Sequence, residues 1–190
     1  MSYFEIKRLQ EEHLAQYDVE EFLFKMIKAE YGYGFVPEYH QDIIDLEKYY
    51  LHPERNNFFL AIDPHTEKVI GTLGIRAYDK DFPLFKNIYN SQNTASIWRV
   101  FVEKSWRRNK VASTLVHCAE DFCQRRDYEK VYLHTHKTVT GSLDFWVSIG
   151  YLVVSDTENH LKTVHMEKKL GNNISVSDAN EAIVTNKIKM

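Results

Sequence analysis

The segment from residue 94 to residue 135 restricts the fold of this chain more than any other part. A strand rich in β-branched and aromatic residues (94–102) leads through a short basic loop into an amphipathic helix (111–126), and a second strand (130–135) follows. Because a helix connects them, these two strands are expected to lie parallel in one sheet, joined by a right-handed crossover.

The strands outside this unit have short connections and are expected to pair antiparallel. Period-2 and period-3.6 patterns predict strands over 4–6, 57–63, 68–77, 151–154 and 161–170, and helices over 11–30, 39–49 and 140–149. This order predicts an α/β fold whose mixed, mostly antiparallel sheet has six to seven strands and helices on both faces. We expect one domain over residues 1–170 and a polar C-terminal extension over 171–190.

Composition excludes several functional classes. The chain has 24 Lys and Arg against 27 Asp and Glu, a net charge of −3, so no basic field favours nucleic acid. No apolar run is long enough to span a membrane, and the first residues lack the apolar core of a signal peptide. We therefore expect a cytoplasmic protein. Cys118 and Cys123 fall on different faces of one predicted helix, which argues against a disulfide between them, and no zinc-ligand spacing predicts a metal.

The loop between residues 102 and 111 predicts an anion site. The first amides of a helix have no intrahelical partner, and the helix dipole is positive there. Arg107, Arg108 and Lys110 add charge of the same sign at the same place. The alternative is a solvated basic turn in front of a surface helix.

Three segments together resemble the GNAT superfamily of N-acetyltransferases. The sequence RRNKVA at 107–112 resembles the Arg/Gln-x-x-Gly-x-Gly/Ala loop of that family. FWVSIGY at 145–151 is similar to its Phe-Tyr-x-x-x-Gly-Phe segment, and HMEKKL at 165–170 is like its last strand. The order of elements also agrees over about residues 3 to 170. The resemblance implies a GNAT-like acyl-CoA N-acyltransferase fold, an acetyltransferase activity and acetyl-CoA as co-substrate, with no metal.

The same resemblance implies which residues bind the cofactor. Along the pantetheine arm and around the pyrophosphate it implies Val100, Phe101, Val102, Arg107, Arg108, Asn109, Lys110, Val111, Ala112 and Ser113. Lys110 replaces the first loop glycine of the family; a lysine could fit there if its φ is negative, with its ammonium compensating by charge, and we expect cofactor binding to survive. Trp146 stands near the cofactor where many members have a tyrosine, and an indole cannot protonate a departing thiolate. The alternative for Trp146 is simple packing of its helix.

Aminolysis of a thioester requires a base that deprotonates the acceptor ammonium. His134, with His136 on the same strand face, is one candidate because its unperturbed pKa lies near neutrality. Glu30 and Asp144 are others. For each of the four, the alternative is a structural or surface role.

The acceptor side is predicted from an aromatic loop. Its walls are expected to be Tyr31, Tyr33, Phe35 and Tyr39. Four nearby carboxylates, which could hold a cationic amine, are Glu38, Asp42, Asp45 and Asp79. The acceptor is expected to be a small amine, an amino acid or a peptide or protein N-terminus.

Glu120, on the predicted cofactor helix, is expected to be solvated.

Three functional hypotheses follow from these patterns. The first is an N-acetyltransferase that transfers an acetyl group from acetyl-CoA to a primary amine. The second is a catalytically silent acyl-CoA-binding or regulatory module. The third is a partner-binding protein that uses the aromatic loops. We expect no nucleic-acid or membrane partner, and a homodimer through a sheet edge stays an open alternative.

Overall fold

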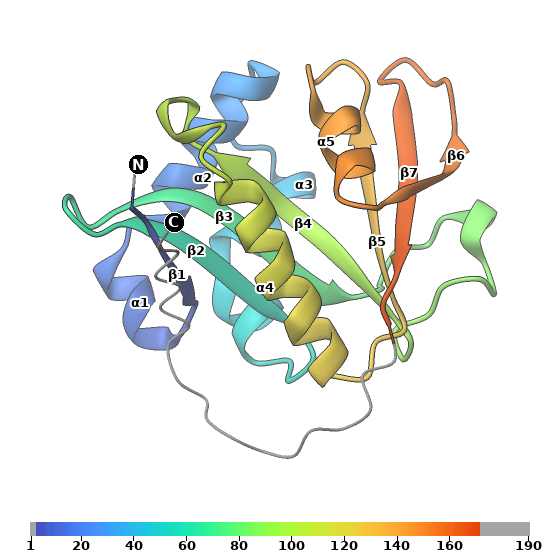
Figure 1. Ribbon diagram of the computed structural model, residues 1–190, viewed down its shortest axis with the longest axis horizontal. Coiled ribbons are helices and arrows are strands. Elements are labelled where there is room, and N and C mark those ends of the chain that lie inside the picture. The colour runs from blue at the N-terminus through green and yellow to red at the C-terminus, as the bar shows by residue number, and fades with distance from the viewer. Residues whose placement is uncertain (1–2, 172–190) are drawn as a thin grey trace.

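The computed structural model describes residues 3–171, which form a seven-stranded sheet with strand order β1-β2-β3-β4-β5-β7-β6 (Figure 1). The strands are β1 (Glu5–Arg8), β2 (Asn57–Asp63), β3 (Lys68–Ala77), β4 (Thr94–Val102), β5 (Lys130–His136), β6 (Leu152–Asp156) and β7 (Thr163–Lys169). The α-helices are α1 (Glu11–Gln16), α2 (Val19–Tyr31), α3 (Pro37–Ile44), α4 (Val111–Arg125) and α5 (Ser142–Ser148). The mixed, mostly antiparallel α/β sheet predicted from the sequence is confirmed.

The centre of the sheet holds its parallel pair. β4 and β5 pair in parallel, as the connecting helix requires, whereas the other neighbours pair antiparallel. The parallel ladder runs from Thr94↔Lys130 to Ser96↔Tyr132 and ends there, although both strands continue. Beyond this point β4 and β5 diverge, which Figure 1 shows toward the top of the view. The sheet therefore opens between residues 97–102 of β4 and residues 133–136 of β5.

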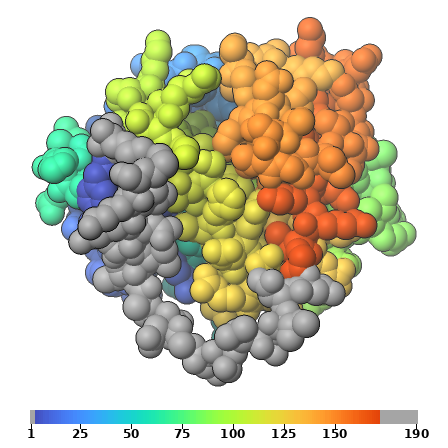
Figure 2. All heavy atoms as spheres, viewed as in Figure 1, coloured from blue at the N-terminus to red at the C-terminus, as the bar shows by residue number. Residues whose placement is uncertain are grey.

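Two apolar clusters cover the two faces of the sheet. On one face α4 and α5 pack against residues such as Leu73, Ile75 and Leu133. On the other face α2 and α3 pack against Phe58, Leu60 and neighbouring side chains. In the space-filling view α4 runs as a band across one face, beside α5 and the last strands (Figure 2). The helices thus lie on both faces, as predicted.

Two predicted helices have different bounds in the structure. The helix expected over 11–30 is two helices, because Tyr17 adopts an extended backbone and buries its ring. The helix expected over 39–49 begins at Pro37, a residue favoured in the first turn, and ends at Ile44. A π-helical turn, Glu47–Leu51, follows and includes the fully buried Tyr50. These changes direct two tyrosines into the core.

The expectation that Glu120 is solvated is wrong. Its side chain is buried in α4 and accepts hydrogen bonds of 2.9 and 2.8 Å from Lys168 Nζ. Lys168 also donates to the carbonyl of Ile149, so this ion pair joins α4, α5 and β7. Cys118 and Cys123 are free thiols, as expected. The predicted C-terminal extension, residues 171–190, lies outside the described residues from position 172 onward.

Candidate active site

A bulge in β4 marks the position where the sheet opens. Thr72 of β3 faces Phe101, whereas Gly74 faces Trp98, so β4 holds one more residue than β3 between these pairs. Arg99 occupies the bulge with φ of +53°, and its carbonyl accepts a 2.8 Å hydrogen bond from Thr72 Oγ1. As a result Trp98 and Arg99 both lie on the α2–α3 side of the sheet. Strict alternation would have placed them on opposite faces.

The side chain of Arg99 is held by a buried carboxylate. Its Nε and Nη2 donate to Asp42 at 3.0 and 2.6 Å, and Nη2 also donates to the carbonyl of Tyr39. Tyr50 donates a third hydrogen bond to Asp42 at 2.6 Å. Burial alone would raise the pKa of Asp42, but the hydrogen bonds and charge of Arg99 outweigh it and lower that pKa. Asp42 is therefore an ionised partner of Arg99 and is not free for a cationic substrate.

The basic loop after β4 has two residues in the left-handed region. Arg108 has φ of +70° and Lys110 φ of +63°. Lys110 does not have the negative φ at which a lysine fits most easily; it keeps the left-handed conformation that a glycine would adopt without strain. The amides of the first turn of α4 have no capping side chain. The hydroxyls of Ser113 and Thr114 donate back to the Lys110 carbonyl instead.

Ion pairs attach this loop to α2. Arg107 pairs with Glu30, and its Nε also donates to the carbonyl of Val102 at 3.2 Å. Lys25 pairs with Glu103 at 3.1 Å. Arg108 and Lys110 are exposed, and neither forms an ion pair within the described part of the chain. The two cations nearest the start of α4 are thus available to an anion.

The residues expected along the pantetheine arm alternate about β4. Val100 and Val102 are half-buried against the α4 cluster, while Phe101 is buried on the opposite face. Trp146 is 5 % exposed, and its ring lies 5.0 Å from that of Phe145. The indole therefore packs within the α4–α5 core, and its contact with a cofactor stays a prediction.

The predicted catalytic residues do not come together in one place. His134 lies on β5 where β4 and β5 have parted; its backbone pairs with β7, and its imidazole has no hydrogen-bond partner among residues 3–171. Burial, with the nearby charge of Lys80, lowers its pKa to about 3, so the imidazole is neutral at physiological pH. Burial also lowers the pKa of His136. Glu30 is occupied by Arg107, and Asp144 is exposed in the first turn of α5.

The four aromatic residues predicted to border the acceptor are exposed. Their exposed fractions are 42 % for Tyr31, 45 % for Tyr33, 51 % for Phe35 and 68 % for Tyr39. Tyr31 and Tyr33 stack with ring centres 5.8 Å apart, and Tyr33 also stacks on His40. Tyr31 lies against Phe101 of β4, at 6.5 Å between ring centres. The loop therefore borders the open end of β4, and a contact with substrate stays a prediction.

Sequence reasoning missed three side chains near the opening, those of Lys80, Arg76 and Trp98. Lys80 Nζ lies 3.4 Å from the centre of the Trp98 ring and 5.9 Å from that of Phe82. The Arg76 guanidinium lies 4.5 Å from the Trp98 ring and pairs with Asp79. A signal was present in the sequence, because Arg99 is the one charged residue of the strand 94–102.

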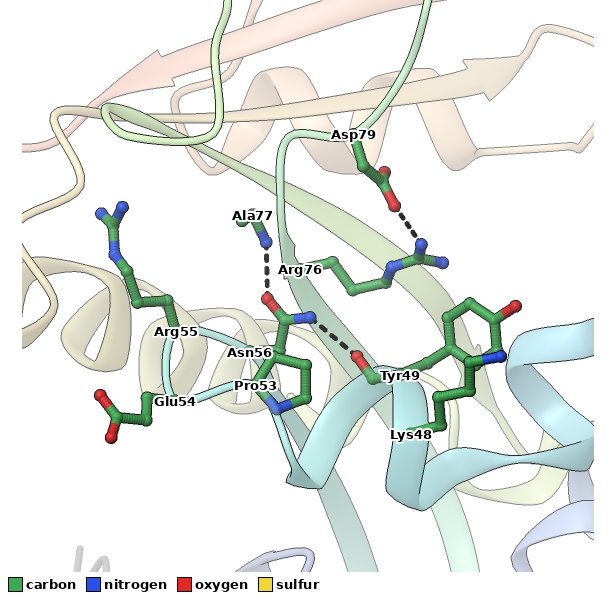
Figure 3. A pocket seen from close by; sticks show the side chains of 9 residues that line it. All are labelled: Lys48, Tyr49, Pro53, Glu54, Arg55, Asn56, Arg76, Ala77 and Asp79. Atoms are coloured by element: carbon green, nitrogen blue, oxygen red, sulfur yellow. Dashed lines mark hydrogen bonds and ion pairs between the residues drawn. The ribbon is translucent and has the colours of Figure 1, made fainter.

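A cavity of about 500 Å³ lies on the Tyr49 side of this cluster (Figure 3). Figure 3 shows Arg76 paired with Asp79 at its edge, and Asn56 bonded to the backbone of Tyr49 and Ala77. None of its lining residues belongs to the cofactor loop.

Within residues 3–171, no three or more His, Cys, Asp or Glu side chains are grouped to hold a metal ion. No helix in that range has both the length and the apolarity of a membrane crossing.

Comparison with known proteins identifies the class of this fold. Over 89 % of this chain it superposes on all of a GNAT-family acetyltransferase from Staphylococcus aureus Mu50, with a TM-score of 0.70 and 19 % identity. It also resembles the PaiA N-acetyltransferase from Thermoplasma acidophilum in complex with coenzyme A, with a TM-score of 0.61 and 19 % identity over 88 % of this chain and 99 % of that one. The fold is that of the CoA-binding acyltransferases.

Residues 20–151 match the acetyltransferase (GNAT) family, and the chain belongs to it. It is therefore an acyltransferase. A curated relative is the N-acetylaspartate synthetase of Mus musculus, 23 % identical over 122 residues. The match covers 64 % of this chain and 36 % of that protein, so the chain spans little more than a third of its relative.

Proposed function

We propose that this acyltransferase transfers an acetyl group from acetyl-CoA to a primary amine. The observation that carries the proposal is the start of α4, where a loop with two left-handed residues leads to uncapped helical amides. Such an N-terminus binds phosphate oxygens through backbone N–H groups and the helix dipole. The exposed cations Arg108 and Lys110 lie at the same place.

Acetyl-CoA fits the residues present. Residues 107–113 would hold the pyrophosphate through amides and charge. The open end of β4 has no β5 partner past Ser96, so backbone groups there, such as those of Val100, are left for the pantetheine amides. When bound, acetyl-CoA supplies the thioester, an activated acyl group with a good leaving thiol.

The reaction assigned to this chain is the acetylation of one amine by the thioester. The acceptor nitrogen bonds to the acetyl carbon and the C–S bond breaks; of the two protons that the ammonium loses, one goes to the departing thiolate and the other to solvent. His134 stands at the opening as a neutral hydrogen-bond acceptor for the amine. Because its pKa is about 3, it is a weak base, and we assign it the role of passing the proton to water. Glu30 positions Arg107.

Calorimetric titration with acetyl-CoA at two salt concentrations tests the cofactor site. Arg108→Ala is expected to raise Kd by about 10-fold, since one charge-assisted contact to phosphate is lost. Arg125→Ala, an exposed arginine at the far end of the same helix, is the matched control and should leave Kd unchanged. Equal affinities for Arg108→Ala and the control would contradict the proposed phosphate site.

One observation favours the second candidate, a silent acyl-CoA-binding module. Trp146, at the position where many family members have a tyrosine, is buried and has no acidic proton to offer. Turnover of acetyl-CoA with a broad panel of amines separates the two candidates. Release of free thiol above a heat-inactivated control eliminates the silent module.

The name of the curated relatives bears on the acceptor. An N-acetylaspartate synthetase makes an acetylated amino acid. This supports a small amine or an amino acid as acceptor, in preference to a peptide or protein N-terminus.

A further inference from the structure

Lys80 is a half-buried cation without a carboxylate of its own. Its ammonium sits over the Trp98 ring at 3.4 Å and near the Phe82 ring at 5.9 Å. No Asp or Glu of residues 3–171 lies within ion-pair distance of Nζ. Contact with two aromatic faces offsets part of the lost hydration, but it leaves the donors of the ammonium open.

Two carboxylates that act on Lys80, those of Asp42 and Asp79, are committed to other cations. The charged groups that act on its ammonium are Arg76, Arg99, Asp42 and Asp79. Asp42 is held by Arg99 and Asp79 by Arg76. Each arginine thus neutralises one acid, and Lys80 is the excess positive charge of the cluster.

The unpaired ammonium lies beside the proposed reaction centre. The Phe82 ring lies 6.1 Å from the ring of His134 and 5.9 Å from Lys80 Nζ, so one aromatic side chain separates the two groups. His134 in turn belongs to the β5 residues that lie beyond the parallel ladder with β4. A ligand that reaches both Lys80 and His134 needs an anionic group at one end and an amine at the other.

We propose that the acceptor is an amine that carries a carboxylate, and that Lys80 binds this carboxylate while the amine faces His134. The inference rests on the proposed acetyl transfer. Asp42 and Asp79, two of the four acids that could have held a cationic amine, are neutralised, and a diamine would meet Arg76, Lys80 and Arg99. A carboxylate completes the hydrogen bonds of the ammonium and removes the excess charge.

The specificity of the wild-type enzyme tests the proposal first. Thiol release is followed with L-alanine and L-alaninamide, with L-aspartate and L-asparagine, and with putrescine. We expect kcat/KM for at least one of the acids to exceed that for its amide by about 10-fold, and putrescine to be the poorest acceptor. Amides or putrescine acetylated as well as the acids would overturn the inference.

Variants of Lys80 test whether this residue binds the carboxylate of the acceptor. Lys80→Met keeps the apolar contacts and deletes the charge, and Lys80→Arg keeps the charge. For the preferred acid we expect Lys80→Met to raise KM by about 10-fold with little change in kcat, whereas KM for its amide stays within about 3-fold. Lys80→Arg should recover part of the loss. Lys86→Met, an exposed lysine of the same connection, is the matched control. Equal losses for acid and amide in Lys80→Met would reduce Lys80 to a structural role and refute the assignment.

Failure of this inference and of the proposed function are distinguishable. If acetyl-CoA does not bind, the acetyl transfer itself is wrong. If acetyl-CoA binds and no acid of the panel is acetylated, the carboxylate proposal is wrong while the cofactor site stands.

Discussion

Replacing Asp42 by Asn should strongly destabilise the fold around the β4 bulge. The side chains of Asp42 and Arg99 are only 5 % and 14 % exposed, and two hydrogen bonds join them. Breaking a buried ion pair from one side costs about 3–5 kcal/mol, because the remaining charge stays buried without a partner. The amide oxygen of Asn retains about one hydrogen bond, worth ~1 kcal/mol. We therefore expect a loss of about 2–4 kcal/mol in the free energy of unfolding.

Urea unfolding, followed by tryptophan fluorescence, measures this loss, and thermal unfolding should show a Tm lower by on the order of 10 °C. Tyr50→Phe is the matched control, because it removes one 2.6 Å hydrogen bond to Asp42 and leaves the ion pair. It should cost about 1 kcal/mol.

A double-mutant cycle decides whether the charge pair is responsible. In Asp42→Asn combined with Arg99→Met no unpaired guanidinium remains, so the double variant should recover about 1–3 kcal/mol relative to the sum of the single losses. Single losses that add within ~0.5 kcal/mol would refute the reasoning, since the two side chains would then be energetically independent.

Three further predictions concern other parts of the molecule. Glu120→Gln should lower the free energy of unfolding by about 2–3 kcal/mol in urea titrations, less than for a fully buried pair because Lys168 keeps 26 % of its side chain exposed. Lys110→Gly should raise the free energy of unfolding by about 0.5–1 kcal/mol, since glycine accepts the positive φ without strain. The same change should weaken acetyl-CoA binding in low-salt calorimetry, because one cation is lost. No gain in stability would argue against strain at Lys110. The pKa of His134 is lowered from 6.5 to about 3 by burial, so the unfolded chain takes up the proton first and stability is lost as pH falls below 6.5. Between pH 7 and pH 5 this residue should account for about 1–2 kcal/mol of the loss, and His134→Gln should show a correspondingly shallower pH dependence in urea unfolding.

The sheet could be predicted from the sequence because its signals are local. Alternating apolar residues define the strands, and the helix over 111–126 forces the parallel pair at residues 94–96. The helix bounds near Tyr17 and Tyr50 could not be predicted, because the burial of those rings depends on partners distant in the sequence.

The candidate site was predictable in part for the same reason. The loop 107–113 is contiguous, so its charges and its helix start are visible in one window. The acceptor side depends on pairings across 57 residues or more: Arg99 with Asp42, and Arg107 with Glu30. Without those pairings each acid counts as free, which is why Asp42 was a candidate to hold a cationic amine and Glu30 a candidate base.

The bulge in β4 links the two halves of the proposed site. By placing Trp98 and Arg99 on the same side, it gives that side the ring on which Lys80 rests and the guanidinium that takes up Asp42. The strand then resumes alternation, so Val100 and Val102 return to the α4 side, from which the basic loop departs. A single extra residue therefore separates the face proposed to meet the acceptor from the face that leads to the proposed phosphate site. Changes that remove the bulge should affect acceptor and cofactor binding together, whereas changes at Lys80 or Arg108 should affect one of them alone.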